Sequence, residues 1–127
     1  MPGELETTVR GFMRLLDAKD FLTMTRQLTD DAQAIDELSR RWLRGRSQIA
    51  DYFKQMGAAV KDLHSELKDV RETTADATGL VTCWLEQDYT YEGKPQHISA
   101  PTTVVLRRNG SEWRLALIHS APLPDSG

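Results

Sequence analysis

Residues 28–53 read LTDDAQAIDELSRRWLRGRSQIADYF, and this stretch contains the change from helix to strand that decides the fold. Alternation of small or apolar side chains with polar ones over residues 32–36 gives a weak strand signal. Trp42–Leu43, set between arginines, predicts a second strand after a turn near residues 38–39. This order places Asp36 at the point where a strand leaves a helix-lined core.

Helical spacing of apolar residues predicts three helices around this stretch. The first has an apolar stripe at i, i+3, i+4 and i+7, with Pro2 near its start. A break follows at residues 17–20, where Asp20 is a candidate N-cap for the second helix. The third helix is expected to fade near residues 61–62. The three stripes are Val9, Phe12, Met13 and Leu16; Phe21, Met24 and Leu28; and Ile49, Phe53, Met56 and Val60.

The second half of the chain predicts four long strands, over residues 63–73, 79–91, 97–107 and 113–120. Asn109–Gly110 is a strong hairpin signal, because both central residues of a type I′ turn need a positive φ. Pro101 lies inside a predicted strand and indicates a bulge or an edge position, since proline cannot donate to the ladder. Strands of this length cannot stay flat, so we expect an α+β fold with three N-terminal helices packed in a bent antiparallel β-sheet.

Composition and charge narrow the class of protein. The 127 residues are expected to form one domain, residues 1–127, with a loose tail at residues 122–127. A formal net charge of −3 predicts no general attraction to nucleic acid, and we expect neither a signal peptide nor a membrane span. Cys83, the single cysteine, has no partner for an internal disulfide, which favours a cytoplasmic location and a role in inert packing. The three histidines lack metal-ligand spacing and no glycine-rich phosphate loop is present, so neither a metal nor a cofactor is expected.

The order of helices and strands, together with four motifs, resembles the NTF2-like superfamily of SnoaL-like proteins and ketosteroid isomerases. The resemblance covers residues 5–121 and is carried by LTDDAQAID, GRSQIADYF, YEGKP and WRLALIHS. It implies a cone-shaped (cystatin-like) fold with a cavity between the concave face of the sheet and the helices. It also implies homodimers formed through the sheet. Because this superfamily includes enzymes, ligand carriers and assembly modules, the fold alone does not set the function.

Comparison with ketosteroid isomerase assigns candidate roles to single residues. Asp36 falls on the general-base aspartate, and Phe12 falls on the oxyanion-binding tyrosine but lacks its hydroxyl. The second oxyanion donor, a carboxylic acid, falls on Thr102 or Thr103, because the YEGKP match and the Asn-Gly turn differ by one residue. His119 falls on a cavity-facing position of the last strand. Steroid isomerisation by that enzyme's mechanism is therefore not expected.

Asp36 and His119 are the two titratable groups expected to converge in the cavity as catalytic residues. A carboxylate that orients an imidazole makes a usable general base, and a threonine hydroxyl can donate weakly to an oxyanion. This predicts proton transfer on a small carbonyl compound, of the isomerase or cyclase type that the resemblance to SnoaL-like enzymes implies. The expected ligand-binding residues are Phe12, Leu16, Trp42, Phe53, Trp84, Thr102, Thr103 and Leu117.

Each of these interpretations has an alternative. Asp36 could be a solvent-facing turn residue and His119 a buried, hydrogen-bonded histidine. Trp84 and Trp113 fit a role as core aromatics. The basic stretch Arg40–Arg46 favours either an anionic ligand near the cavity mouth or a solvated hairpin. The chain could thus be a small-molecule enzyme, a ligand carrier without chemistry, or a dimerisation module, and we expect a homodimer.

Overall fold

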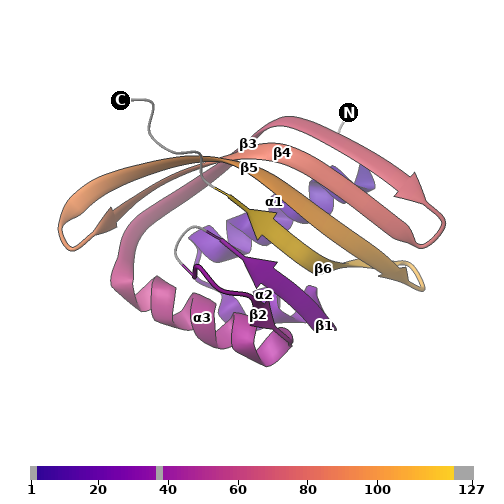
Figure 1. Ribbon diagram of the computed structural model, residues 1–127, viewed down its shortest axis with the longest axis horizontal. Coiled ribbons are helices and arrows are strands. Elements are labelled where there is room, and N and C mark those ends of the chain that lie inside the picture. The colour runs from indigo at the N-terminus through magenta and orange to yellow at the C-terminus, as the bar shows by residue number, and fades with distance from the viewer. Residues whose placement is uncertain (1–2, 37–38, 122–127) are drawn as a thin grey trace.

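The computed structural model describes residues 3–36 and 39–121, so the predicted tail at residues 122–127 and part of the turn predicted near residues 38–39 lie outside the described residues. Within these two ranges the fold has three helices and a six-stranded sheet, with strand order β2-β1-β6-β5-β4-β3 (Figure 1). No helix within the described ranges is long and apolar enough to cross a membrane. In chain order the elements are α1 (Glu4–Asp17), α2 (Phe21–Arg26), β1 (Leu28–Ile35), β2 (Leu43–Arg44), α3 (Arg46–Ala59), β3 (Val60–Ala75), β4 (Thr78–Tyr91), β5 (Lys94–Asn109) and β6 (Glu112–Ser120).

The long strands β3, β4 and β5 bend over the helices, which lie on the concave side of the sheet (Figure 1). This arrangement confirms the predicted α+β fold with helices packed in a bent sheet. The neighbouring strands pair antiparallel except for β1 and β6, which run parallel. A parallel pair needs a long crossover, and here the connection contains β2, α3, β3, β4 and β5.

The two N-terminal helices meet at the predicted break. Asp20 caps α2 as predicted, since its side chain accepts a hydrogen bond from the backbone N–H of Thr23 at 3.3 Å. Leu5 of α1 packs against Gly79 of β4, where a Cβ atom would stand 2.7 Å from the leucine side chain. The predicted apolar stripe of α1 is buried and comprises Val9, Phe12, Met13 and Leu16.

Helix α3 passes directly into β3. Val60, predicted as the last residue of the helical stripe, is instead the first residue of β3 and pairs with Tyr91. Its backbone is extended, with φ −110° and ψ 151°, a conformation that suits a β-branched side chain. The ammonium group of Lys19 donates to the carbonyl oxygens of Gly57 (2.7 Å) and Val60 (2.8 Å). Lys19 therefore satisfies carbonyl groups that the end of a helix leaves without intrahelical partners.

The hairpin turn between β5 and β6 differs from the prediction by one residue. Asn109 belongs to β5 and pairs with Glu112, so the two turn residues are residues 110–111. Gly110 has φ 69°, whereas Asn109 is not in the positive-φ region. The double positive-φ turn occurs instead at Glu92–Gly93, with φ values of 51° and 78°, between β4 and β5.

Pro101 occupies a local edge within β5. The last pair that β5 forms with β6 is Thr102 with Ser120, and the N–H of Ala121 then donates to the carbonyl of Pro101 at 3.2 Å. The proline nitrogen faces the side on which β6 ends, so no ladder hydrogen bond is lost. The register shift between β5 and β6 lies farther along β5, between residues 105 and 106.

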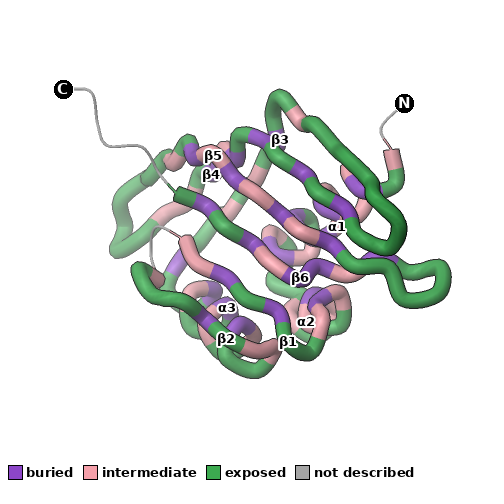
Figure 2. The backbone as a smooth tube through the Cα atoms, turned by 45° about the vertical axis from the view of Figure 1, so that its right-hand side comes forward, coloured by how far each residue is buried: buried purple, intermediate pink, exposed green. Residues whose placement is uncertain are grey.

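Burial alternates along the strands, as the colours of the backbone tube show (Figure 2), so the sheet has one buried and one exposed face. On β4, the inward side chains are buried, but Trp84 lies between two of them and is 36% exposed. Trp84 is therefore on the outer face, which corrects its expected place in the core. The buried inward residues of β4 are Val81, Cys83, Leu85 and Gln87.

Two buried residues agree with the roles expected from the sequence. Trp113 belongs to the core cluster that includes the helices, and the guanidinium of Arg108 lies 5.4 Å from the centroid of its ring. Cys83 is buried, and this burial raises the pKa of its thiol to about 11, although the charge of Arg10 acts in the opposite direction. A thiol with such a pKa is unreactive at neutral pH, as expected of a packing residue.

Candidate functional site

An internal cavity of about 40 Å³ lies between the concave face of the sheet and the helices. A single water needs roughly 10–15 Å³ measured in this way, so the cavity has room for a few waters or one small functional group. Its wall is mostly apolar, with a carboxylate, a carboxamide and a hydroxyl among the lining side chains. The lining residues are Phe12, Met13, Leu16, Asp36, Phe53, Met56, Leu85, Gln87, Ile118 and Ser120.

Asp36 lies in the wall of this inner cavity because of the alternation along β1. Ala34 faces inward and pairs with Ile118, so the side chain two residues later, just beyond the end of β1, points to the same side. The hydroxyl of Tyr52 donates to the carboxylate, at 2.7 Å from Oδ1 and 3.0 Å from Oδ2. The backbone N–H of Ser39 also donates to Oδ1, at 2.8 Å. The half-buried Asp36 is thus held at the cavity rather than in a turn that faces solvent.

Tyr52 is a site residue that the reading of the sequence missed. It lies in α3, three residues after Ile49 and four before Met56, so helical spacing puts it on the inward face of that helix. That spacing was the available signal. Other lining residues missed by the sequence analysis are Met13, Met56, Gln87 and Ser120.

The structure does not bring His119 to the cavity. Its neighbours Ile118 and Ser120 both line the cavity, so His119 between them faces the outer side of the sheet, where it is exposed. Its ring lies 6.0 Å from that of Trp42, and Trp42 is 42% exposed on the same outer face. The expected pairing of the Asp36 carboxylate with an imidazole is therefore not formed, because the predicted register of β6 was wrong by one residue.

The remaining predicted ligand-binding residues divide between the two faces. Phe12, Leu16 and Phe53 line the inner cavity as expected. Thr102 faces inward and is buried, and its hydroxyl lies 2.9 Å from that of Ser120. Three others lie on the outer face, by strand alternation and by their exposure: Thr103, Leu117 and Trp84.

A larger groove adjoins the inner cavity at the open end of the fold, between α3 and the β4–β5 hairpin. Its volume is about 470 Å³, within the range of roughly 300–1,000 Å³ that is usual for small-molecule sites. Met56 lines both spaces, and Tyr52 lines the groove while its hydroxyl bonds to Asp36. The groove is therefore next to the residue that holds the carboxylate. The residues of this outer groove are Tyr52, Gln55, Met56, Ala59, Val60, Tyr89, Tyr91 and Gln96.

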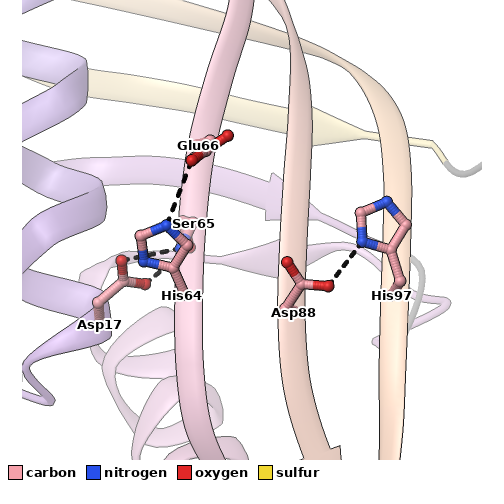
Figure 3. Close-up of polar contacts among 6 residues, drawn as sticks. All are labelled: Asp17, His64, Ser65, Glu66, Asp88 and His97. Atoms are coloured by element: carbon pink, nitrogen blue, oxygen red, sulfur yellow. Dashed lines mark hydrogen bonds and ion pairs between the residues drawn. The ribbon is translucent and has the colours of Figure 1, made fainter.

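Two chains of hydrogen bonds hold the polar side chains of the inner cavity. In the first, Asp17 at the end of α1 accepts from the hydroxyl of Ser65 (2.7 Å) and from its backbone N–H (2.9 Å), a contact drawn in Figure 3. Gln87 Nε2 donates to the same hydroxyl oxygen at 3.0 Å. In the second, the hydroxyl of Thr102 donates to the backbone carbonyl of Ala100 at 3.1 Å and contacts Ser120.

Other charged groups lie outside the cavity. His97 is an exposed residue whose Nδ1 lies 2.8 Å from Asp88 (Figure 3), and this hydrogen bond is the main reason why the pKa of His97 is raised. In the basic stretch, Arg46 donates to the carbonyl of Leu28 at 2.7 Å and pairs with Asp30 at 3.0 Å. Within residues 3–36 and 39–121, no group of three or more His, Cys, Asp or Glu residues is placed to hold a metal ion.

Comparison with known proteins identifies the fold and the family. The SnoaL-like domain family matches residues 5–125. The sequence has no significant match among curated proteins. A proposed dehydratase of the NTF2-like family from Streptomyces avermitilis is 18% identical, with a TM-score of 0.87 and 96% of each chain covered.

Two further solved structures share this fold. A proposed calcium/calmodulin-dependent protein kinase II association domain from Xanthomonas campestris is 17% identical, with a TM-score of 0.85 over 96% of this chain and 87% of that one. A protein from Catenulispora acidiphila, in complex with S-DNPA, is 16% identical, with a TM-score of 0.79 over 94% and 90% of the two chains. At these identities the likeness shows the fold, which is the predicted NTF2-like cone.

Proposed function

Since the chain belongs to the SnoaL-like domain family, we propose that it binds a small, largely apolar molecule in the inner cavity and outer groove, and that Asp36 acts on this molecule as a general base. The observation that carries the proposal is the position of the Asp36 carboxylate in a mostly apolar wall. A carboxylate is costly to place there unless it is well hydrogen-bonded, and Tyr52 and the Ser39 N–H meet that need.

The two spaces would hold different parts of the ligand. The inner cavity, at about 40 Å³, takes one small functional group beside Asp36. The outer groove, at about 470 Å³, takes the apolar body between Tyr89 and Tyr91 on β4 and Met56 on α3. Because the inner space is lined by packed side chains, a ligand that enters it excludes bulk water from the carboxylate.

The reaction type implied by the family resemblance is isomerisation or cyclisation of a carbonyl compound. Asp36 would take a proton from the substrate and return it at another position of the product, and Tyr52 would position the carboxylate through the hydrogen bond at 2.7 Å. Removing a well-placed general base lowers turnover by about 10²–10⁴-fold. Asp36→Asn keeps the shape of the side chain, so in an enzyme it should lower turnover by this factor and leave ligand affinity close to normal.

A ligand carrier without chemistry is the second candidate. It is favoured by one observation: among the described lining residues of the inner cavity, Asp36 is the single titratable side chain. A carboxylate that shares the cavity wall with no second titratable side chain among the described residues can bind a polar group without carrying out a reaction cycle. In a carrier, Asp36→Asn changes only the affinity.

Methionine methyl groups provide a direct test of the site. Met13 and Met56 line the inner cavity, whereas Met24 is buried and lines neither of the two spaces. In protein labelled with ¹³C at the methionine methyls, titration with 1-indanol should shift the NMR signals of Met13 and Met56 and leave that of Met24 unchanged. Equal shifts of all three signals, or no shift at Met13 and Met56, would contradict the proposed site.

The outer face of the sheet supports the proposal of a homodimer. Trp42, Leu80 and Trp84 are 42%, 39% and 36% exposed, and such apolar groups on one face are typical of an interface. Sedimentation should give a dimer that Trp84→Glu converts to a monomer; a wild-type monomer at tens of micromolar would contradict this proposal.

The lone, buried Cys83 supports a cytoplasmic place of action.

A further inference from the structure

We propose that the inner cavity selects a ligand group that donates hydrogen bonds, such as a hydroxyl or an N–H, over a carbonyl oxygen. The inference rests on the proposed function, in that the inner cavity is taken as the binding site. It follows from the direction of the hydrogen bonds around the cavity, which can be worked out from the chemistry of each partner.

The first chain of bonds begins at Asp17. A carboxylate only accepts, so the hydroxyl of Ser65 must donate its hydrogen to Asp17, at 2.7 Å. The Ser65 oxygen is then left to accept, and it accepts from Gln87 Nε2 at 3.0 Å. If the carboxamide of Gln87 were turned over, its oxygen would face an oxygen whose hydrogen is already committed. The orientation of Gln87 is therefore fixed.

This orientation directs the amide oxygen of Gln87 toward the cavity. Ser65 pairs with Gln87 across β3 and β4, so Nε2 points toward β3. None of the described residues that line the cavity comes from β3, and the lining residues of β6 lie on the opposite side of β4 in the strand order. Because the nitrogen and oxygen of a carboxamide point in different directions, the oxygen is the atom turned away from β3 and toward the cavity.

The second chain fixes Ser120 in the same sense. Thr102 has one hydroxyl hydrogen, and it donates this hydrogen to the carbonyl of Ala100 at 3.1 Å. The geometry of the 2.9 Å contact between Thr102 and Ser120 allows either oxygen to donate, and with the Thr102 hydrogen on Ala100 we assign Ser120 as the donor. With its hydrogen committed to Thr102, Ser120 offers the cavity only the lone pairs of its oxygen.

The third polar group of the wall, the carboxylate of Asp36, also accepts. The hydroxyl that lies closest to it, that of Tyr52, has its hydrogen directed at the carboxylate, at 2.7 and 3.0 Å from the two oxygens. Gln87, Ser120 and Asp36 thus all present acceptors, and the other lining side chains from the described part of the chain are apolar.

The ligand class follows from this arrangement. A carbonyl oxygen placed in the inner cavity would meet three sets of lone pairs and would lose its hydrogen bonds to water without replacement. A hydroxyl or N–H group would find an acceptor in any of three directions. The chemistry that fits is an apolar compound that bears an alcohol, phenol, enol or N–H group, with this group in the inner cavity. The apolar part and the carbonyl group of the proposed substrate would then lie in the outer groove.

The test uses two probes with one skeleton, 1-indanol, which can donate, and 1-indanone, which can only accept. Dissociation constants are measured from the methyl signals of Met13 and Met56. The wild-type protein should bind 1-indanol about two- to tenfold more tightly, the usual value of one net hydrogen bond. Thr102→Val removes the acceptor that holds the hydrogen of Ser120, so this hydrogen can turn into the cavity and improve the affinity for 1-indanone by a similar factor.

Thr103→Val is the matched control, because Thr103 is the adjacent residue of β5 but lies on the outer face. It should leave both dissociation constants unchanged. The inference is overturned if the wild type binds 1-indanone as tightly as 1-indanol, or if Thr102→Val behaves like Thr103→Val. If neither probe shifts Met13 and Met56, the proposed site itself is wrong, and the inference falls with it.

Discussion

Replacing Tyr52 with phenylalanine should destabilise the protein by removing one hydroxyl. The hydroxyl donates to Asp36 at 2.7 and 3.0 Å, while the ring packs with its centroid 5.4 Å from that of Phe53. Tyr52→Phe keeps the ring contact and removes only the hydrogen bond. A hydrogen bond to a charged group contributes about 1.5–3 kcal/mol, and because Asp36 and Tyr52 are only half-buried we expect a loss of about 1–2 kcal/mol.

A double-mutant cycle measures this interaction by urea unfolding of the wild type, Tyr52→Phe, Asp36→Ala and the double variant. The coupling free energy should be about 1–2 kcal/mol, because each single change removes the same bond. Tyr91→Phe, at an exposed tyrosine of the outer groove, is the control and should be close to neutral. A coupling free energy near zero would refute the placement of Tyr52 against the carboxylate.

Three other predictions concern residues outside the cavity. Trp113→Ala should lower the free energy of unfolding by about 3–5 kcal/mol, since the indole is buried in the core; an unchanged melting temperature would contradict its placement. Cys83 should react slowly with a disulfide reagent at pH 8 and faster as the pH approaches its pKa of about 11, and fast reaction of the folded protein would be evidence against its burial. The NMR titration midpoint of His97 should lie above 6.5 and fall in Asp88→Asn. Because this pKa is raised on folding, the stabilisation by His97 should be complete below about pH 6.5 and disappear as the pH rises through the raised value.

The sequence predicts the fold well where one hydrophobic periodicity extends through a whole helix or strand. The stripe from Val9 to Leu16 is buried as its spacing predicts, and the four long strands of the second half are present. Boundaries are harder, because two tendencies compete at one residue. Val60 fits the helical stripe of α3 but is β-branched, and its pairing with Tyr91 makes it a strand residue. The pairing of Val60 with Tyr91 joins residues that are remote in sequence, so the local pattern does not indicate it.

The candidate site could be predicted only in part. Asp36 and the apolar wall follow from local spacing together with the family resemblance. His119 does not reach the cavity, because a shift of one residue in a strand moves a side chain to the opposite face. Tyr52 could have been found from helical spacing. The contact of Asp17 with Ser65, 48 residues apart, depends on how α1 lies against β3 and has no local signal.

The end of β6 beside Pro101 gives the two binding spaces unequal rigidity. Beyond this point, among residues 3–36 and 39–121, β5 has no strand neighbour on one side, and the sheet continues as β5, β4 and β3. This overhang carries Tyr89, Tyr91 and Gln96, the wall of the outer groove. Backbone amides there should exchange with deuterated solvent sooner than those beside Ser120. Backbone movements of the overhang can then accommodate ligands with larger or smaller apolar parts. The polar group of the ligand, in contrast, meets the rigid wall of the inner cavity. The site would therefore tolerate ligands whose apolar parts differ in size, but would discriminate strictly between ligands by their hydrogen-bonding group.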